Sequence, residues 1–443
     1  MLWLPLNVFA PGYLPCERFR QNYQRLARRE YTLRAIGVFS PMHRHTGSQG
    51  DYYSGTGPES PGSKSFFSIR TFHFSREQPG SFKVKNLTRT VRLWALSDTH
   101  VGTEIKFGRR SLEEAIRQAE AWPAEPGTAD DSRGFDIAVN LGDFSGSQLP
   151  PDDEEGELVV AQYATAKNHG REHFYDVIGN HDASGADEPT QWWFKKWIDP
   201  TGESTEFSGI DNTKRPYPTS GTWEHYSFEV GNILFLMLAD RNDGGPPIGR
   251  GEFGGYPAGA ISEETFEWWT EKVRDNTDKI VITAHHHMIK ETTVASGLNE
   301  GCDGGYHGRM PDGGAPGASL IYWVGGQKDS GRIENFLAEN TPAIDLWLGA
   351  HTHTHPDDTT GGRSHIEQKW GANFVNVSAI TRYHGQKNSI PMSRLFTFAE
   401  GSDEVRVQCY LHTDQYAPEG WYKQSERTLK LRHKFEVPAA HSD

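Results

Sequence analysis

Cysteine is scarce in this 443-residue chain, which has only Cys16, Cys302 and Cys409 and no C-x-x-C pair. An odd, widely spaced set argues against a disulfide framework and fits a reducing compartment. The sequence also lacks an apolar run of the roughly 18 residues that a transmembrane helix needs. The apolar start, residues 1–16, is interrupted by prolines and follows no basic segment, so it does not match a signal peptide. We therefore expect a cytoplasmic protein with no membrane partner, with a mis-assigned start codon or a trimmed signal as the alternative.

A long run of lysine or arginine is absent as well. Lys and Arg total 45 against 59 Asp and Glu, which gives a formal net charge of −14. Such a chain is a poor non-specific binder of nucleic acid, because phosphate backbones are held mainly by basic side chains. The composition argues against a nuclease and favours a small-molecule substrate, although acidity also simply keeps proteins in solution. The sequence carries no signature of an oligomeric state.

From residue 91 onward, apolar β-type runs mix with amphipathic segments, which predicts a layered α/β fold. We expect strands at 91–97, 135–141, 173–178, 279–284, 344–348, 373–379, 394–399 and 405–411, and helices at 111–122 and 262–276. Ser262 is the expected N-cap of the second helix. The Gly-Asn pair at 231–232, between runs at 223–230 and 233–239, predicts a β-hairpin.

Three regions depart from this pattern. Residues 1–90 are interpreted as a small β-rich and irregular N-terminal region of unknown role, with one strand at 67–72. Residues 296–331 are rich in glycine and begin soon after a polar cluster, so we expect a flap over the site, with a neutral surface insertion as the alternative. Residues 411–443 are expected to form a polar tail. The main domain would then span 91–410.

Five short polar clusters, each placed directly after an apolar run, are the most informative feature. They are Asp98-Thr99-His100, Gly142-Asp143, Gly179-Asn180-His181-Asp182, His285-His286-His287 and His351-Thr352-His353. Asp-x-His or Gly-Asp alone is common in turns. In open α/β sheets, however, ligands gather beyond the carboxyl ends of strands, so five clusters in this position can converge. Their imidazole, carboxylate and amide donors suit Mn, Fe, Co or Zn.

The order, spacing and placement of these clusters resemble the calcineurin-like metallophosphoesterases. The resemblance covers roughly 91–400, including the hairpin tract 226–232 and the Leu-Ala-Asp at 238–240. It implies an α/β/β/α sandwich, with the β-rich N-terminal region outside it. It also implies two divalent metal ions about 3.5–4 Å apart, bridged by one carboxylate.

The resemblance assigns a ligand set. The first ion would be held by Asp98, His100, Asp143 and His353, and the second by Asp143, Asn180, His351 and His285. His285 is preferred because the family usually uses the first histidine after the strand, and His286 is the alternative. The last motif has Ala350 where the family usually has glycine, and a shifted register through His353 and His355 stays open. Gly146 stands where purple acid phosphatases have a tyrosine ligand, so the ferric-tyrosinate form of the site is not expected.

The implied activity is metal-dependent hydrolysis of a phosphomonoester or phosphodiester by a metal-bridging hydroxide. His181 would be the general acid for the leaving group, and Asp182 would hold its ring and raise its proton affinity. Arg382 and His384 are candidate phosphate ligands, or equally members of an ordinary surface ion pair. Two alternatives are a non-catalytic scaffold of the same fold, which the retained Asn180 and His181 argue against, and a nuclease.

Overall fold

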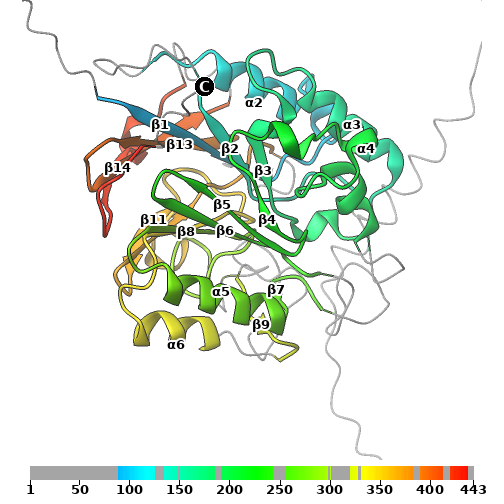
Figure 1. Cartoon of the computed structure of the whole chain (residues 1–443). Coiled ribbons are helices and arrows are strands. Elements are labelled where there is room, and N and C mark those ends of the chain that lie inside the picture. Colours follow the sequence, from blue (N-terminus) through cyan, green and yellow to red (C-terminus); the bar gives the residue numbers. More distant parts are fainter. Residues whose placement is uncertain are drawn as a thin grey trace, which may run out of the picture. The chain divides into compact units, whose positions relative to one another are not determined.

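Two β-sheets lie face to face between two layers of helices (Figure 1). The computed structural model describes residues 88–124, 134–147, 150–184, 191–242, 256–297, 300, 320–327, 331–382, 390–412 and 420–437. The expected α/β/β/α layering is confirmed in these residues. The N-terminal region up to residue 87, with its expected strand, and most of the expected flap at 296–331 lie outside them.

The first sheet has the order β15-β14-β13-β1-β2-β3. Its strands are β1 (Thr90–Leu96), β2 (Ile137–Asn140), β3 (Phe174–Asp176), β13 (Met392–Ala399), β14 (Glu404–Leu411) and β15 (Arg427–Lys430). β1, β2 and β3 are parallel, and the others pair antiparallel. Leu96 pairs with Asn140, and Asn140 with Asp176, so the three parallel strands end in one row.

The second sheet has the order β11-β12-β10-β8-β6-β5-β4. Its strands are β4 (Ser220–Gly221), β5 (His225–Val230), β6 (Ile233–Leu238), β8 (Ile280–Ala284), β10 (Leu346–Gly349), β11 (Ile366–Lys369) and β12 (Ala372–Asn376). β6, β8, β10 and β12 are parallel. Val230 pairs with Ile233, which confirms the hairpin around residues 231–232. Two short strands, β7 (Ala260–Ile261) and β9 (Trp323–Val324), pair separately.

Helices cover the outer face of each sheet (Figure 1). α2 (Ser111–Glu120) and α3 (Asp153–Tyr163) pack on the first sheet, with the short α4 (Thr205–Ser208) beyond them, while α5 (Glu263–Asp275) and α6 (Gly331–Glu339) pack on the second. The Ser262 hydroxyl accepts a hydrogen bond from the Thr265 amide, which confirms the expected N-cap. None of the helices in the described part of the chain is long and apolar enough to cross a membrane.

Apolar side chains fill both faces of the parallel strands. Because successive side chains of a strand point to opposite faces, Leu93 and Ile137 enter the core between the sheets, while Trp94 packs toward α2. Each fully buried aliphatic side chain contributes about 1.5–3 kcal/mol to stability. The strands are therefore firmly held, and their carboxyl ends form a rigid edge from which loops project.

The structure contains several elements that were not predicted from the sequence, among them α3, α6, β11 and β15. α3 was not predicted, because it contains Gly156, where a Cβ would overlap the ring of Trp197. The expected polar tail after residue 411 is wrong for residues 420–437. This segment contributes β15 to the first sheet and places Leu429, Leu431 and Phe435 in the core between the sheets.

Candidate metal centre

The five polar clusters follow the carboxyl ends of β1, β2, β3, β8 and β10. The first three strands end in one row, and Leu348 of β10 pairs with Ala284 of β8. Backbone hydrogen bonds continue past the strand ends, from the Asp98 amide to the Gly142 carbonyl (2.9 Å) and from the His100 amide to the Asp143 carbonyl (3.0 Å). The clusters therefore meet at one edge of the sandwich.

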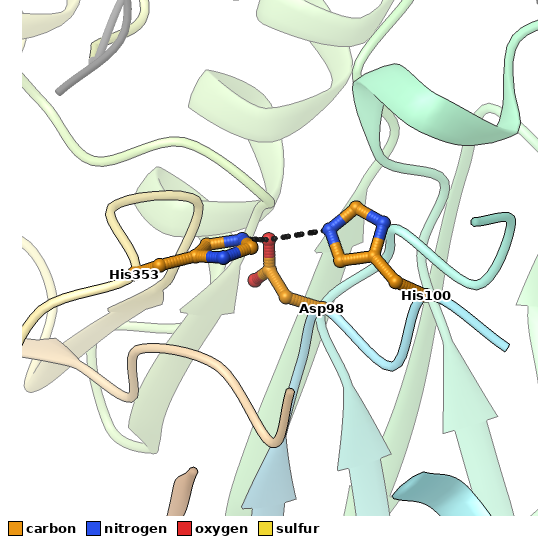
Figure 2. Close-up of side chains that lie close together, drawn as sticks. All are labelled: Asp98, His100 and His353. Atoms are coloured by element: carbon orange, nitrogen blue, oxygen red, sulfur yellow. Dashed lines mark hydrogen bonds and ion pairs between the residues drawn. The ribbon is translucent and has the colours of Figure 1, made fainter. Parts of the chain in front are cut away.

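Asp98, His100 and His353 form the first group of potential ligands (Figure 2). Asp98 Oδ1 lies 2.7 Å from Nε2 of His353 and 3.8 Å from Nε2 of His100. All three side chains are buried. Burial opposes ionisation of Asp98, but the surrounding histidines, His353 first and then His286, hold its pKa well below the usual range. The group therefore presents an ionised carboxylate between imidazole nitrogens.

Asp143, His286 and His351 form the second group. His286 Nε2 lies 3.3 Å from Asp143 Oδ2, 3.1 Å from His351 Nδ1 and 3.0 Å from Asn180 Oδ1. Burial lowers the pKa of His286, but Asp143 and Asp98 raise it to about 10 overall. The cluster thus carries a strong negative potential that favours cations.

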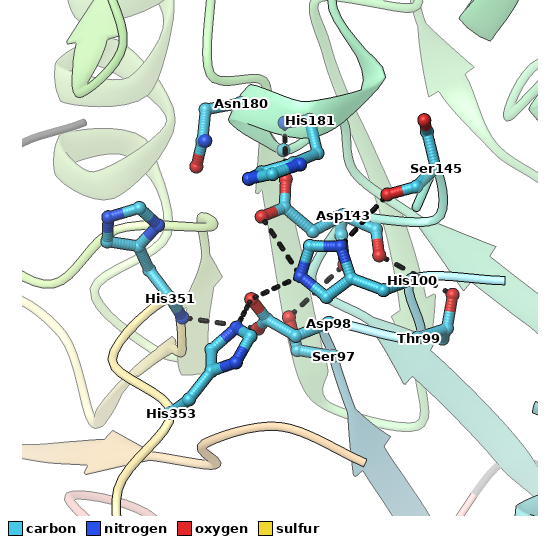
Figure 3. Close-up of polar contacts among 12 residues, drawn as sticks. Ser97, Asp98, Thr99, His100, Asp143, Ser145, Asn180, His181, His351 and His353 are labelled. Atoms are coloured by element: carbon cyan, nitrogen blue, oxygen red, sulfur yellow. Dashed lines mark hydrogen bonds and ion pairs between the residues drawn. The ribbon is translucent and has the colours of Figure 1, made fainter. Parts of the chain in front are cut away.

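Asp143 links the two groups. Its Oδ2 lies 3.8 Å from His100 Nε2 as well as 3.3 Å from His286 Nε2. Figure 3 shows its carboxylate between His181 and His100, with Asn180 and His351 across from it. A third group, formed by His100, Asp143 and His181, shares this carboxylate. One carboxylate is thus shared by the groups of potential ligands.

The structure brings His286 into the cluster in place of the preferred His285. The β8 residues Ile282 and Ala284 face the core between the sheets, so the same alternation turns residue 286 toward that core and residue 285 away from it. The ring of His285 instead accepts a hydrogen bond from the His287 amide at Nδ1 (2.8 Å). His286, the alternative ligand, therefore replaces His285 in the predicted set.

Asp182 does not have the role expected for it. Its four hydrogen bonds come from backbone amides: Oδ1 accepts from Phe144 (2.7 Å) and Ser145 (3.0 Å), and Oδ2 from Asp143 and Gly179 (both 2.9 Å). Asp182 therefore holds the loop that carries Asp143, rather than the ring of His181. Because Asp182 follows His181 directly in the sequence, we expected it to contact the ring of His181, but its carboxylate instead faces the loop that carries Asp143.

Three histidine rings are oriented by backbone carbonyls of the loop that follows β2. Nδ1 of His286 lies 2.7 Å from the Leu141 carbonyl, Nδ1 of His100 2.9 Å from that of Ser145, and Nδ1 of His181 3.1 Å from that of Ser147. A carbonyl only accepts, so each Nδ1 carries the proton and donates it. The Nε2 atoms of His100 and His286 thereby face the carboxylates as potential ligands, the arrangement typical of metal-binding histidines.

The loops that carry the candidate ligands have unusual backbone conformations. Four of the candidates have positive φ: Asp98 (53°), His100 (39°), Asp143 (57°) and His351 (67°). Such conformations cost of order 1–3 kcal/mol each and collect at functional sites. Gly142 and Gly179 face each other so closely that a Cβ on either would overlap the backbone of the other loop. Glycine is therefore required in both motifs.

The donor set fits divalent metal ions. In the part of the chain that the structure describes, the charged partners of Asp98 and Asp143 are histidines, with no lysine or arginine among them. Two buried carboxylates so close together need further positive charge. A mixed set of imidazole nitrogens and carboxylate and amide oxygens suits Mn, Fe, Co or Zn. The ligand assignments, and the number and identity of the ions, stay predictions.

The remaining candidate residues lie at the margin of the cluster or outside the described residues. Arg382 is exposed, and its backbone amide donates to Glu104 (2.6 Å), so its substrate role stays a prediction. His384 lies outside the described residues. His355 accepts from the Asp357 amide at Nδ1 (3.1 Å), while His351 and His353 both belong to the groups above, which favours the original register.

Some residues that build the site were missed. Asn242, which was not a candidate, donates from Nδ2 to the Asn180 carbonyl (2.6 Å). His287 was named only as a member of the histidine run, and its ring lies 4.1 Å from that of His351. Ser145 and Ser147 act through their carbonyls, which leaves no trace in the sequence. A Cβ at Gly146 would overlap Thr103 and the Val101 carbonyl, so this backbone has no room for the tyrosine ligand of purple acid phosphatases.

The comparison with family models agrees with this arrangement. A family model described as calcineurin-like phosphoesterase matches residues 91–355. Similar solved structures include a putative 5′-nucleotidase from Staphylococcus aureus (11% identity, TM-score 0.34, 80% of this chain and 57% of that chain). Others are the sulfate thiohydrolase SoxB from Thermus thermophilus (13%, 0.34, 76% and 58%) and vacuolar protein sorting 29 from Cryptosporidium parvum (12%, 0.29, 77% and 98%).

Those TM-scores are too low to support any conclusion about activity. The chain also spans little more than half the length of the nucleotidase and SoxB chains. No curated protein matches the sequence. The family model, by contrast, covers more than half of the chain and contains every candidate metal ligand described above. The chain belongs to the calcineurin-like phosphoesterase family.

Proposed function

We propose that the protein hydrolyses a small-molecule phosphoester, either a monoester or a diester, with two divalent metal ions. The observation that carries the proposal is the placement of Asp143, whose Oδ2 lies within 4 Å of Nε2 of both His100 and His286. A single buried carboxylate between two sets of nitrogen and oxygen donors is the arrangement that a dinuclear centre requires.

The two sets divide around this carboxylate. Asp98, His100, Asp143 and His353 would hold one ion, and Asp143, Asn180, His286 and His351 the other. Bound ions would offset the charge of the phosphate oxygens and activate a water molecule as the nucleophile. Mn, Fe, Zn and Co all suit these donors.

His181 is the proposed general acid. Its backbone amide donates to Asp143 Oδ1 (2.6 Å), which places it directly beside the shared carboxylate. Its ring lies 4.6 Å from the ring of His100. Nδ1 donates to the Ser147 carbonyl, so Nε2 is left to face the leaving oxygen, and the ring delivers a proton from Nε2 when it is in the imidazolium form, with both nitrogens protonated. The ring thus stands next to the ligands without being needed as one.

A non-catalytic scaffold is the second candidate, and the site gives it less support. A protein that had lost catalysis would be free to lose His181 or one of the ligands, because nothing would select for their geometry. Here the acid, both carboxylates and the histidines are all present and buried together. Four of these residues are also kept in strained backbone conformations, which a scaffold would not require.

The test is hydrolysis of para-nitrophenyl phosphate and bis-para-nitrophenyl phosphate after loading with Mn, Fe, Co or Zn. We expect turnover of at least one ester by the wild type and a loss of at least about 100-fold in Asp143→Asn, since metal-assisted activation depends on the shared carboxylate. Glu206→Gln, at an exposed position on α4, is the matched control and should keep full activity. No turnover with any of the four metals, despite two ions bound per chain, would refute the proposal.

A further inference from the structure

The loop after β2 orients two histidines with two carbonyls. The Ser145 carbonyl accepts from His100 Nδ1 (2.9 Å), and the Ser147 carbonyl accepts from His181 Nδ1 (3.1 Å). Each hydrogen bond fixes both the tautomer and the orientation of its ring. The position of this loop therefore decides whether a ligand and the proposed general acid point correctly.

Two carboxylates hold the amides of this loop. The carboxylate of Asp182 accepts hydrogen bonds from the backbone amides of residues 143, 144 and 145. Glu155 takes the next donors: its Oε1 accepts from the Ser145 hydroxyl and from the Ser147 amide, both at 3.0 Å. With its donors bound in this way, the loop turns the carbonyls of Ser145 and Ser147 toward the histidine rings.

Glu155 is itself firmly placed. It lies in the first turn of α3, where its amide donates to the N-cap side chain of Asp152 (3.0 Å). The Asp152 carbonyl in turn accepts from the buried Trp193 at Nε1 (2.6 Å). Burial raises the pKa of Glu155 above its ordinary value, while the Ser145 hydroxyl favours its ionised form. The side chain therefore connects a rigid helix end to the catalytic loop.

We propose that Glu155 is a positioning residue for the general acid, acting through the Ser147 carbonyl on the ring of His181. Its effect should be selective. Ser145 is also held by Asp182 and by its bridge to Val101, so His100 keeps its orientation when Glu155 is lost. The Ser147 amide is held by Glu155 Oε1 (3.0 Å) and by the Ser145 hydroxyl (3.1 Å), and that hydroxyl is itself held by Glu155 (3.0 Å). A Glu155 variant should therefore keep its bound metal ions but lose part of the acid catalysis by His181.

The first experiment reads the imidazole tautomers directly by ¹⁵N NMR of histidine-labelled protein, with the His181 signals assigned from a His181→Ala sample. At a pH where the rings are neutral, we expect the His181 signals in Glu155→Ala to move from the Nδ1–H tautomer toward a mixture of tautomers, while those of His100 stay in place. Glu155→Gln keeps an oxygen acceptor and should restore the wild-type signals. Glu154→Ala, at the exposed neighbouring position, is the control. Unchanged His181 signals in Glu155→Ala would overturn the inference.

The second readout rests on the proposed function and compares two leaving groups. A general acid matters most when the leaving oxygen is basic, so phenyl phosphate should depend on His181 more than para-nitrophenyl phosphate. General acid catalysis contributes about 10²–10⁴-fold, so Glu155→Ala should lower kcat about 10–100-fold for phenyl phosphate and less than about 3-fold for para-nitrophenyl phosphate. KM and metal content should be unchanged.

An equal loss of kcat on both esters would overturn the positioning role, because it would indicate general damage to the site. If the wild type hydrolyses neither these two monoesters nor bis-para-nitrophenyl phosphate with any of the four metals, the proposed function fails. The tautomer measurement still decides the role of Glu155 in that case, since it needs no turnover. Ser145→Ala offers a second variant: it removes one of the two groups bound by Glu155 and should shift the His181 signals in the same direction.

Discussion

Replacing Asp182 by asparagine tests how the central loop is held. The two side chains have nearly the same shape, so the change leaves no cavity. Each carboxylate oxygen accepts two backbone amides, those of Phe144 and Ser145 on Oδ1 and those of Asp143 and Gly179 on Oδ2. Whichever way the asparagine amide turns, its NH₂ group meets two N–H donors and leaves both without an acceptor.

An unsatisfied buried donor costs about 1–3 kcal/mol, so Asp182→Asn should lower the free energy of unfolding by about 2–6 kcal/mol. Denaturant unfolding would measure this loss, and amide hydrogen exchange should show reduced protection at residues 143–145. Asp275→Asn, at an exposed position, is the control and should stay within about 0.5 kcal/mol of the wild type. A loss below about 1 kcal/mol, combined with an altered His181 ring, would instead restore the original interpretation of Asp182 as its partner.

Three further predictions concern other positions. His286→Ala should remove one bound metal ion per chain, as counted by elemental analysis. His285→Ala should keep both ions and affect only the stability of the fold. Gly179→Ala should destabilise the fold by about 1–3 kcal/mol or more, seen as a lower Tm, because its Cβ would overlap the Asp143 backbone. Burial lowers the pKa of His412 to about 3, against about 6.5 when unfolded. Below pH 6.5, His412 therefore binds a proton in the unfolded chain but not in the native chain. Stability should fall by up to about 1.4 kcal/mol per pH unit from pH 6.5 toward pH 3. His412→Gln should flatten this dependence in denaturant titrations across that range, and an unchanged slope would contradict the assignment.

The fold was largely predictable where the sequence pattern is strong. β1 and β8 are continuous apolar runs, and the Gly-Asn pair at 231–232 marks a two-residue hairpin, so these elements follow from residue types alone. α3 was missed because its packing depends on the contact of Gly156 with Trp197, far along the chain. β15 was missed because its sequence is mostly polar, and Leu429 is its one buried apolar residue.

The candidate site was predictable to the level of clusters but not of orientation. Strand ends located Asp98, Asp143 and His351, because parallel strands bring their carboxyl ends together. The sequence could not choose His286 over His285, since β8 is apolar on both faces and its alternation is hidden. Contacts that depend on carbonyls or backbone amides were also out of reach, because every residue has these groups and no residue type marks them.

Anomalous diffraction from a crystal grown with Mn²⁺ would show whether Asp143 is shared by two metal ions. We expect two manganese peaks about 3.5–4 Å apart, the spacing typical of dinuclear centres. One should lie among Asp98, His100 and His353, the other near His286 and His351, with the Asp143 carboxylate between them. A single peak, no peak at this edge of the sheets, or a peak bound by His285 would contradict the proposed dinuclear centre.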